Sequence, residues 1–323
     1  MKTSSSYLRH TYSGFEPSKA FDVIYGGSFE HRLRSGRCAT MEHQRLVVGD
    51  LRLETGSYDF PVVAQGNMPH DAICVGFVAA GSELTRYNTQ AIQEDEIQVY
   101  PEGVELLYDA RGASRWITLT VSESDLQQSA MRRTGRALLL PKAAESVRLA
   151  QGGRFLLTRL ADDAMTLARS LEPVGGIGPD LANAMSASLL SGYVDALLKA
   201  DAACRPGKSS ATERHYHLIL ACERLILSGE DTNVAIAEIA RRSGYSLRAL
   251  ELIFRGSVGM TPSRWFLNIR LNGALRDLIT PAQSSTVSEI AMKWGFRHFS
   301  RFSEQYRKVF GEAPSQTLSR ARG

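Results

Sequence analysis

Two stretches of this 323-residue chain repeat one another: EIARRSGYSLRALELIFRGSVGMTPS (238–263) and EIAMKWGFRHFSRFSEQYRKVFGEAPS (289–315). Their Glu-Ile-Ala and Gly-aromatic positions match at an offset of 51 residues. After one inserted residue, the aromatic-Arg, Gly and Pro-Ser positions match at an offset of 52. A repeat that keeps its register over this length indicates two copies of one supersecondary unit.

The first copy has the residues that a helix-turn-helix requires. Small Ala240 lets a second helix cross closely, and Gly244 supplies the positive φ of a tight turn between helices. Tyr245 is expected to fill the corner, and Ser246 is a good N-cap for the following helix. The apolar positions of that helix, which we expect to face inward, are Leu247, Leu250, Ile253 and Phe254.

The second copy follows the same logic with Ala291, Gly295 and Phe296. Its N-cap is predicted to be weaker, because Arg297 stands where Ser246 stands in the first copy. The inward positions of its second helix are predicted to be Phe302, Tyr306 and Phe310.

The segment between the copies predicts a long joining helix. Thr261 is a suitable N-cap, and Pro262 suits the first helical position. The stretch PSRWFLNIRLNGALRDLI (262–279) would form a rod of roughly 27 Å at about 1.5 Å per residue. Such a rod can hold two recognition helices in successive major grooves, about 34 Å apart on one face of a duplex. A helical bundle without a DNA role would explain the apolar positions, but not the basic outer faces of both units.

Charge is distributed unevenly along the chain. From Arg205 to the end there are 18 Lys and Arg against 10 Asp and Glu, whereas the residues before it have 20 against 24. A basic back half behind a slightly acidic front half indicates a polyanionic partner for the back half.

The front of the chain is rich in predicted strands. Between 45 and 121, short segments such as RLVVGDLRLETGSY and SRWITLTVS are broken by Gly, Pro and Asn, which predicts a cupin-like domain or small antiparallel barrel. Residues 17–34 are predicted to be helical. Apolar spacing also predicts helices at 154–171 and 180–200, which could belong either to the core or to a dimer seam.

We therefore predict an α+β fold with a division into four parts. These are a β-rich effector-binding or regulatory domain (1–153), a helical segment that could serve dimerisation (154–204), a linker (205–213) and a domain with two helix-turn-helix units (214–323).

These patterns resemble a known family. The strings IAxxxGYSxxxLxxxF…GxTP and IAxxxGFxxxxxFxxxY…FGxxP, with Arg270-Leu271, Ala274 and Leu278 in the joining helix, look like the DNA-binding domain of AraC/XylS transcription regulators. The stretch IRLNGALRDLITP…STVSEIAMKWGFRHFSRF most resembles the activators of ethanolamine-utilisation operons. The resemblance implies a cytoplasmic regulator that binds promoter DNA and contacts RNA polymerase. Its N-terminal domain would bind a small-molecule effector or form a homodimer.

The outer faces of the two predicted recognition helices carry the candidate DNA-binding residues. We expect Arg248 and Arg301 to read bases, because Arg bidentate to guanine is the commonest specific contact. Arg255 and Arg307 lie further along and are expected to meet phosphate. Leu252 stands where the family often has a polar reader, and it could touch a thymine methyl or pack against the joining helix. The full set is Ser246, Arg248, Glu251, Leu252, Arg255, Arg297, His298, Ser300, Arg301, Glu304 and Arg307.

An effector pocket in the β-rich domain would be lined by aromatic residues from strands, although such residues often only fill a core. The candidates are Tyr58, Phe77, Tyr100 and Trp116, and after them Phe60, Tyr87 and Tyr108.

Other chemistry has little support. No GxSxG elbow, HExxH or P-loop occurs, so we expect neither an enzyme nor a cofactor. His215 and His217 do not share a helix face, and His31, His43 and His70 lie far apart, so no metal site is expected. The four scattered cysteines are typical of reduced thiols, and neither a secretory leader nor a membrane partner is expected. The alternative class is a small-molecule-binding or enzymatic β-barrel protein whose helical C-terminal domain serves assembly.

Overall fold

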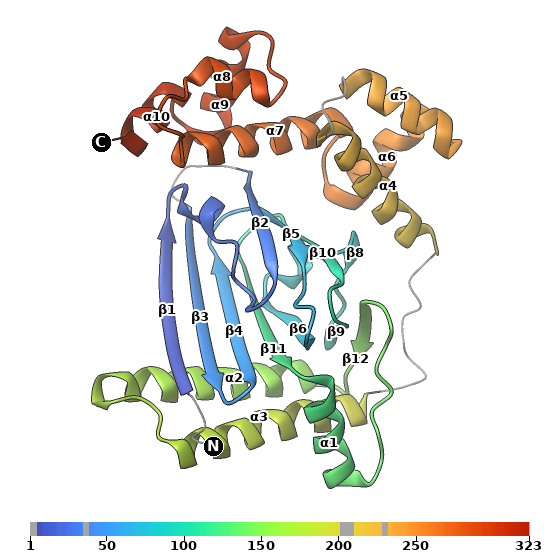
Figure 1. The fold of residues 1–323 in the computed structure, drawn as a ribbon. Coiled ribbons are helices and arrows are strands. Elements are labelled where there is room, and N and C mark those ends of the chain that lie inside the picture. Colours follow the sequence, from blue (N-terminus) through green and yellow to red (C-terminus); the bar gives the residue numbers. More distant parts are fainter. Residues whose placement is uncertain (1–4, 35–38, 201–209, 228–231, 323) are drawn as a thin grey trace.

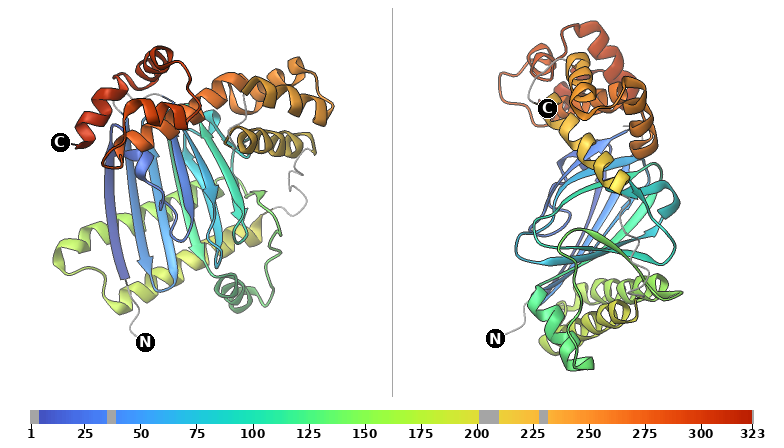
Figure 2. Two further views of the ribbon diagram at one scale, coloured as in Figure 1. Left: turned by 45° about the horizontal axis from the view of Figure 1, so that its top comes forward. Right: turned by 90° about the vertical axis from the view of Figure 1, so that its right-hand side faces the viewer.

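The structure is a computed structural model of the chain, and it describes residues 5–34, 39–200, 210–227 and 232–322. It has three tiers, with helices at one end, two β-sheets in the middle and a second helical domain at the other end (Figures 1 and 2). This is the predicted α+β arrangement of a β-rich N-terminal region and a helical C-terminal domain, and the prediction is confirmed.

The two sheets are antiparallel throughout and face each other as a flattened barrel. Alternate side chains of both sheets point between them and form a shared apolar core, because successive residues of a strand face opposite sides. The strands of the seven-stranded sheet, in spatial order, are β1 (Ser5–Ser13), β3 (Thr40–Val48), β4 (Leu51–Tyr58), β11 (Ser114–Val121), β6 (Ile73–Ala80), β9 (Glu96–Tyr100) and β12 (Glu145–Arg148). Those of the five-stranded sheet are β2 (Ser28–Leu33), β5 (Val62–Asn67), β10 (Glu105–Ala110), β7 (Thr85–Tyr87) and β8 (Gln90–Ala91).

Residues 17–34 do not form the predicted helix. A single helical turn, η1 (Glu16–Lys19), is followed by a loop and then by β2. Gly26 has a φ of +77°, which glycine adopts readily and which turns the chain into the sheet. Val23 and Ile24 mimic helical spacing in the sequence, but they are buried because the loop packs into the barrel.

Three helices cover the outer face of the seven-stranded sheet. Leu157, Met165 and Tyr193 are buried against the strands, so one face of the 154–200 helices belongs to the core. The other face exposes Phe155 and Leu156, and a dimer seam there stays a prediction. The helices are α1 (Glu123–Thr134), α2 (Gly153–Leu171) and α3 (Pro179–Lys199); η2 (Ser82–Leu84) and η3 (Glu172–Val174) are short 3-10 turns.

The C-terminal domain is entirely helical. Its first helix begins at Ser210, within the predicted linker 205–213, and residues 205–209 of that linker lie outside the described residues. The helices are α4 (Ser210–Leu227), α5 (Thr232–Ser243), α6 (Leu247–Val258), α7 (Pro262–Ile279), α8 (Val287–Lys293), α9 (Phe299–Phe310) and α10 (Pro314–Arg322).

Helix α7, the predicted joining helix, lies across the end of the barrel beside β2 (Figure 1). Arg32 Nη1 lies 3.0 Å from Glu223 Oε1, and Trp265 Nε1 donates to the same oxygen at 2.6 Å. Asn272 pairs with the backbone of Leu33. All five residues are buried, so a buried polar network fixes α7 and α4 to the barrel.

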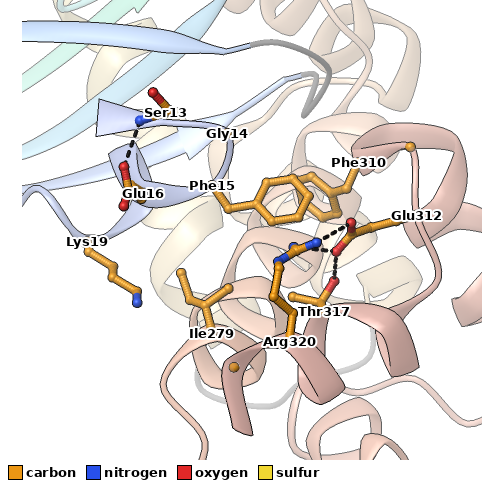
Figure 3. Close-up of a pocket in the computed structure, with 12 residues that line it drawn as sticks. Ser13, Gly14, Phe15, Glu16, Lys19, Ile279, Phe310, Glu312, Thr317 and Arg320 are labelled. Atoms are coloured by element: carbon orange, nitrogen blue, oxygen red, sulfur yellow. Dashed lines mark hydrogen bonds and ion pairs between the residues drawn. The ribbon is translucent and has the colours of Figure 1, made fainter. Parts of the chain in front are cut away.

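A second contact joins the loop of η1 to the other end of the C-terminal domain (Figure 3). The ring of Phe15 packs edge-on against Phe310, with 5.7 Å between centroids, and Arg320 lies over Phe15. Arg320 and Thr317 both donate to Glu312 beside this contact. The barrel therefore contacts both helix-turn-helix units, since Arg111 donates to the carbonyl of Ser257 in α6 at 3.3 Å and Phe15 packs on Phe310 of α9.

No helix in the described ranges is long and apolar enough to cross a membrane. Cys74 and Cys222 are buried free thiols, whereas Cys38 and Cys204 lie outside the described residues.

Candidate nucleic-acid interface

The two copies of the repeat fold into the same turn. Tyr245 N donates to Ala240 O at 3.1 Å in the first unit, and Phe296 N donates to Ala291 O at 2.9 Å in the second. The glycines before the two aromatic residues have φ values of +72° and +76°. The Gly-aromatic pair therefore forms the tight helix-to-helix turn that the sequence predicts.

The two units differ at the start of the second helix. Ser246 caps α6, because its hydroxyl accepts a hydrogen bond from Ala249 N at 3.1 Å. The N-cap of α9 is His298, which makes no side-chain capping bond. The predicted weakness of this cap is confirmed, but its residue is His298 and not Arg297. Ser246 and His298 are 52 positions apart, so Arg297 is the inserted residue of the turn.

Helix α6 packs largely as predicted. Leu250, Ile253 and Phe254 are buried, but Leu247 is 57% exposed, contrary to the prediction. Leu247 is the first residue of α6, and its side chain leans back toward the turn, where it stays in solvent. Leu252 is 63% exposed, so it belongs to the outer face and does not pack against α7.

The outer face of α6 carries both positively and negatively charged side chains. Arg248 is exposed, and Arg255 forms an ion pair of 2.8 Å with Glu251 one turn before it. Because both partners are largely in solvent, this pair adds little stability, but it does occupy Arg255. A phosphate contact by Arg255 would have to displace Glu251.

Helix α9 has the same division into two faces. The predicted inward residues Phe302, Tyr306 and Phe310 are buried, and their rings pack in a row. The outward candidates, all exposed, are His298, Ser300, Arg301, Glu304 and Arg307.

A groove of about 400 Å³ lies between α7 and the start of α9. It is lined by Arg297, His298 and Arg301 on the α9 side and by Arg264 and Arg270 on the α7 side. The last two are absent from the sequence candidates. A helical projection of the joining segment does not group them, because six residues at 3.6 per turn place them about 120° apart around α7.

A second candidate site lies inside the barrel. A cavity of about 30 Å³ is lined by Tyr58, Tyr100 and Trp116, together with Tyr87 and Tyr108. These residues come from both sheets and are buried, so the cavity is closed in this conformation. Their contact with an effector stays a prediction.

Phe77 does not line this cavity, which corrects its place among the effector candidates. It lies on the outer side of β6, where it packs in the cluster formed by the sheet with α2 and α3. Its neighbour Val78 faces the barrel interior instead.

Two polar side chains inside the barrel lack a protein partner. Neither the Gln98 amide nor the Tyr100 hydroxyl finds a hydrogen-bond partner in the described part of the chain. Burial raises the pKa of Tyr100 well above its ordinary value, so its hydroxyl stays a proton donor at neutral pH. Buried polar groups of native proteins usually have partners, and the Tyr100 hydroxyl, which lines the cavity, is therefore suited to bind a polar ligand group.

The interior histidines are neutral structural groups. Burial lowers the pKa values of both His31 and His43 to about 4, and His31 Nε2 lies 2.9 Å from Tyr58 Oη. Among the described residues, no three His, Cys, Asp or Glu side chains come together as a metal site.

Comparison with known proteins bears on the C-terminal domain. Residues 239–320 match the family model described as "Helix-turn-helix domain". The C-terminal part of the chain is therefore a helix-turn-helix domain in both sequence and structure.

The relatives share this part of the chain. The probable thc operon regulatory protein of Rhodococcus erythropolis is 41% identical over 86 residues, which are 26% of each chain. The XylDLEGF operon transcriptional activator of Pseudomonas putida is 37% identical over 87 residues, 27% of each chain. The chain thus spans about a quarter of the length of the curated relatives it matches. A solved structure of a probable AraC family transcriptional regulator from Rhodopseudomonas palustris CGA009 is 31% identical, covering 33% of this chain and 99% of that one, with a TM-score of 0.30.

Proposed function

We propose that this protein is a sequence-specific DNA-binding regulator of transcription, an activator that responds to a small-molecule effector. The observation that carries the proposal is that one helix, α7, joins two matching helix-turn-helix units. Helices α6 and α9 each present an exposed face with arginines, and the 18 residues of α7 span roughly 27 Å between the units. Major grooves on one face of a duplex are about 34 Å apart, so the two helices fit successive grooves of promoter DNA.

The exposed arginines divide into two roles. Arg248 and Arg301 lie in the first turn of their helices, where recognition helices contact base edges, and they would read guanine. Arg255 and Arg307 lie two turns later and would contact phosphate. Leu252, exposed between them on α6, is placed to touch a thymine methyl.

The experiment is selection of duplexes from a randomised library by the full chain, followed by shift assays on the winning sequence. The Arg301→Ala variant should lose discrimination at one base position, by about 1–3 kcal/mol. Unchanged discrimination would remove Arg301 from the base-reading role. Failure of the wild type to select any sequence or to bind DNA in a salt-dependent manner would favour the assembly role for the C-terminal domain.

The barrel cavity is the proposed effector site. Its support is the aromatic lining combined with the unpartnered hydroxyl of Tyr100, which is one of the lining residues. A ligand larger than one or two waters would have to open the cavity, which holds only about 30 Å³. The resemblance of the C-terminal sequence to ethanolamine-operon activators makes small amines the first class to screen.

Effector binding is tested by thermal-shift screening of the full chain against ethanolamine and related amines, amino acids and cobalamin-type cofactors. A true effector should raise the melting temperature of the wild type more than that of Tyr100→Phe, which lacks only the hydroxyl. No shift with any amine would end the ethanolamine assignment.

Contact with RNA polymerase and homodimer formation complete the proposal. Transcription in vitro from a selected site, with and without the chain, measures activation directly. Sedimentation of the full chain measures dimer formation, and the exposed Phe155 and Leu156 give the variants that should weaken it.

A further inference from the structure

The groove between α7 and α9 differs from other clefts of the molecule in its charge. Its charged lining residues are Arg264, Arg270, Arg297 and Arg301, and none of the residues that line it is acidic. The cleft of Figure 3, between η1 and α10, instead mixes Glu16 and Glu312 with Lys19 and Arg320. Four guanidinium groups around one groove raise a positive potential that suits a polyanion.

The wall of the groove formed by Arg270 lies on the side of α7 opposite its contact with the barrel. Arg270 is two residues from both Asn268 and Asn272, and at 3.6 residues per turn this places it opposite them. The two asparagines bind the carbonyl of Leu33 in the barrel. Every residue that lines the groove belongs to the C-terminal domain. The barrel can therefore stay attached to α7 while the groove is occupied.

The groove is continuous with the proposed reading surface. His298 and Arg301, at the start of α9, form one of its walls. Because the start of α9 forms this wall and α7 joins the two units, a duplex read by both units would pass beside the groove along the stretch between its two occupied major grooves. Over that stretch the duplex presents its sugar-phosphate backbone around the minor groove, and contacts there position the protein without reading sequence.

Resting on the proposed function, we infer that Arg264 and Arg270 form a phosphate-binding site for the DNA backbone between the two recognition helices. Arginine suits this role because its planar fork can donate two hydrogen bonds to one phosphate. Arg264 is exposed at the first turn of α7, so its replacement leaves the packing of the helix intact. This site would set the register of both reading helices on the duplex.

The experiment compares full-length Arg264→Gln with wild type on the duplex chosen by selection and on a scrambled duplex. The matched control is Arg159→Gln, which removes an exposed arginine from α2, at the opposite end of the molecule. Each lost phosphate contact should lower the slope of log K against log salt by about 0.9. Between about 50 and 200 mM salt, the wild type should thus lose about 3.5-fold more affinity than the variant. The loss should be equal on both duplexes, and Arg264→Lys should keep most of the slope.

Further variants decide between the outcomes. Arg264→Gln combined with Arg270→Gln should lower the slope by about 1.8. The inference is wrong if Arg264→Gln behaves like Arg159→Gln, or if it changes sequence preference instead of overall affinity. It is equally wrong if Arg264→Lys loses as much slope as Arg264→Gln. A wild type without salt-dependent DNA binding would overturn the proposed function itself, and the two failures are therefore distinct.

Discussion

Asn272 of α7 uses both ends of its side-chain amide on the backbone of Leu33, accepting from its N–H at 2.7 Å and donating to its carbonyl at 2.9 Å. Both residues are fully buried, and Asn268 donates to the same carbonyl at 3.0 Å. An amide that satisfies both backbone groups of one residue acts as a substitute for a neighbouring strand. A helix of the C-terminal domain thus takes the place of a neighbouring strand at this point on the edge of β2.

We expect Asn272→Leu to destabilise the full chain by roughly 2–4 kcal/mol, because the N–H of Leu33 would remain buried without a partner. Urea unfolding followed by tryptophan fluorescence, with Trp116 in the barrel and Trp265 and Trp294 in the C-terminal domain, should also separate into two transitions as the barrel and the C-terminal domain uncouple. Ser263→Ala, on the exposed side of α7, is the control. A single unchanged transition in Asn272→Leu would show that this contact does not join the domains.

Replacing Arg32 alone should lower the free energy of unfolding more than replacing both Arg32 and Glu223, its partner in the buried ion pair. Burial alone would lower the pKa of Arg32, but Glu223 and Glu30 outweigh it and hold the group charged. We expect Arg32→Met to cost about 3–5 kcal/mol, because the Glu223 carboxylate would stay buried without its cation.

The double variant Arg32→Met with Glu223→Gln should recover at least about 1 kcal/mol of that loss, since the amide oxygen of the introduced glutamine can still accept from Trp265. Unfolding free energies of the four proteins form the double-mutant cycle. Additive losses would mean that the two side chains do not interact.

Gly273 and Gly256 provide a matched pair of substitutions. A Cβ at Gly273 would overlap the indole ring of Trp294, which packs against α7 and donates to Asp277 at 2.8 Å. A Cβ at Gly256 meets nothing within 4 Å. We expect Gly273→Ala to lose about 1–3 kcal/mol through overpacking and Gly256→Ala to gain about 0.5–1 kcal/mol. Equal effects in urea unfolding would contradict the packing of Trp294 on α7.

The neutral His31 should make the barrel sensitive to acid. Its pKa is lowered from 6.5 to about 4 by burial, so the unfolded chain binds the extra proton. Its contribution is fully present above pH 6.5 and is lost as the pH falls toward 4, by about 3 kcal/mol at most. His43 acts in the same direction, whereas Glu54, whose pKa burial raises to about 7, acts oppositely as the pH rises.

The variant His31→Asn should therefore show a flatter loss of stability between pH 6.5 and 4 than the wild type, whatever its stability at neutral pH. Exposed His10→Asn serves as the reference. Parallel pH profiles for wild type and His31→Asn would disprove the assignment.

The pairing of Glu251 with Arg255 should restrain DNA binding. Glu251→Gln releases Arg255 and removes a negative charge from the reading face, so we expect tighter binding to any duplex and a salt slope steeper by up to about 0.9. Asp163→Asn on α2 is the control for the change of net charge. Binding that matches this control would show that Arg255 does not reach the backbone.

The C-terminal domain could be predicted from the sequence because its signals are local. A glycine with positive φ, the aromatic residue after it and the serine that follows lie within three residues of one another. The uncapped start of α9 was predictable for the same reason, although the placement of the inserted residue at Arg297 was not. The exposure of Leu247 could not be predicted from the sequence, because its spacing fits the apolar face of α6. Only the length of the neighbouring helices determines whether the side chain is covered.

The barrel was less predictable because its signals are distant. Residues 17–34 have helical spacing as well as alternation, and only the partner strand β5 and the turn at Gly26 favour a strand. Phe77 could not be assigned to one face, because β6 is buried on both. The link between Leu33 and Asn272 joins residues 239 positions apart and has no local signal at all.

The alternation of β2 has a consequence for how such proteins can be recombined. Phe29 and His31 belong to the barrel interior, while Arg32 and the backbone of Leu33 are bound by the helical domain. A graft that joins this DNA-binding domain to a foreign sensor would leave Glu223 and Asn272 facing an unmatched edge. The smallest transferable module is therefore discontinuous, consisting of residues 210–322 together with the six-residue strand at residues 28–33.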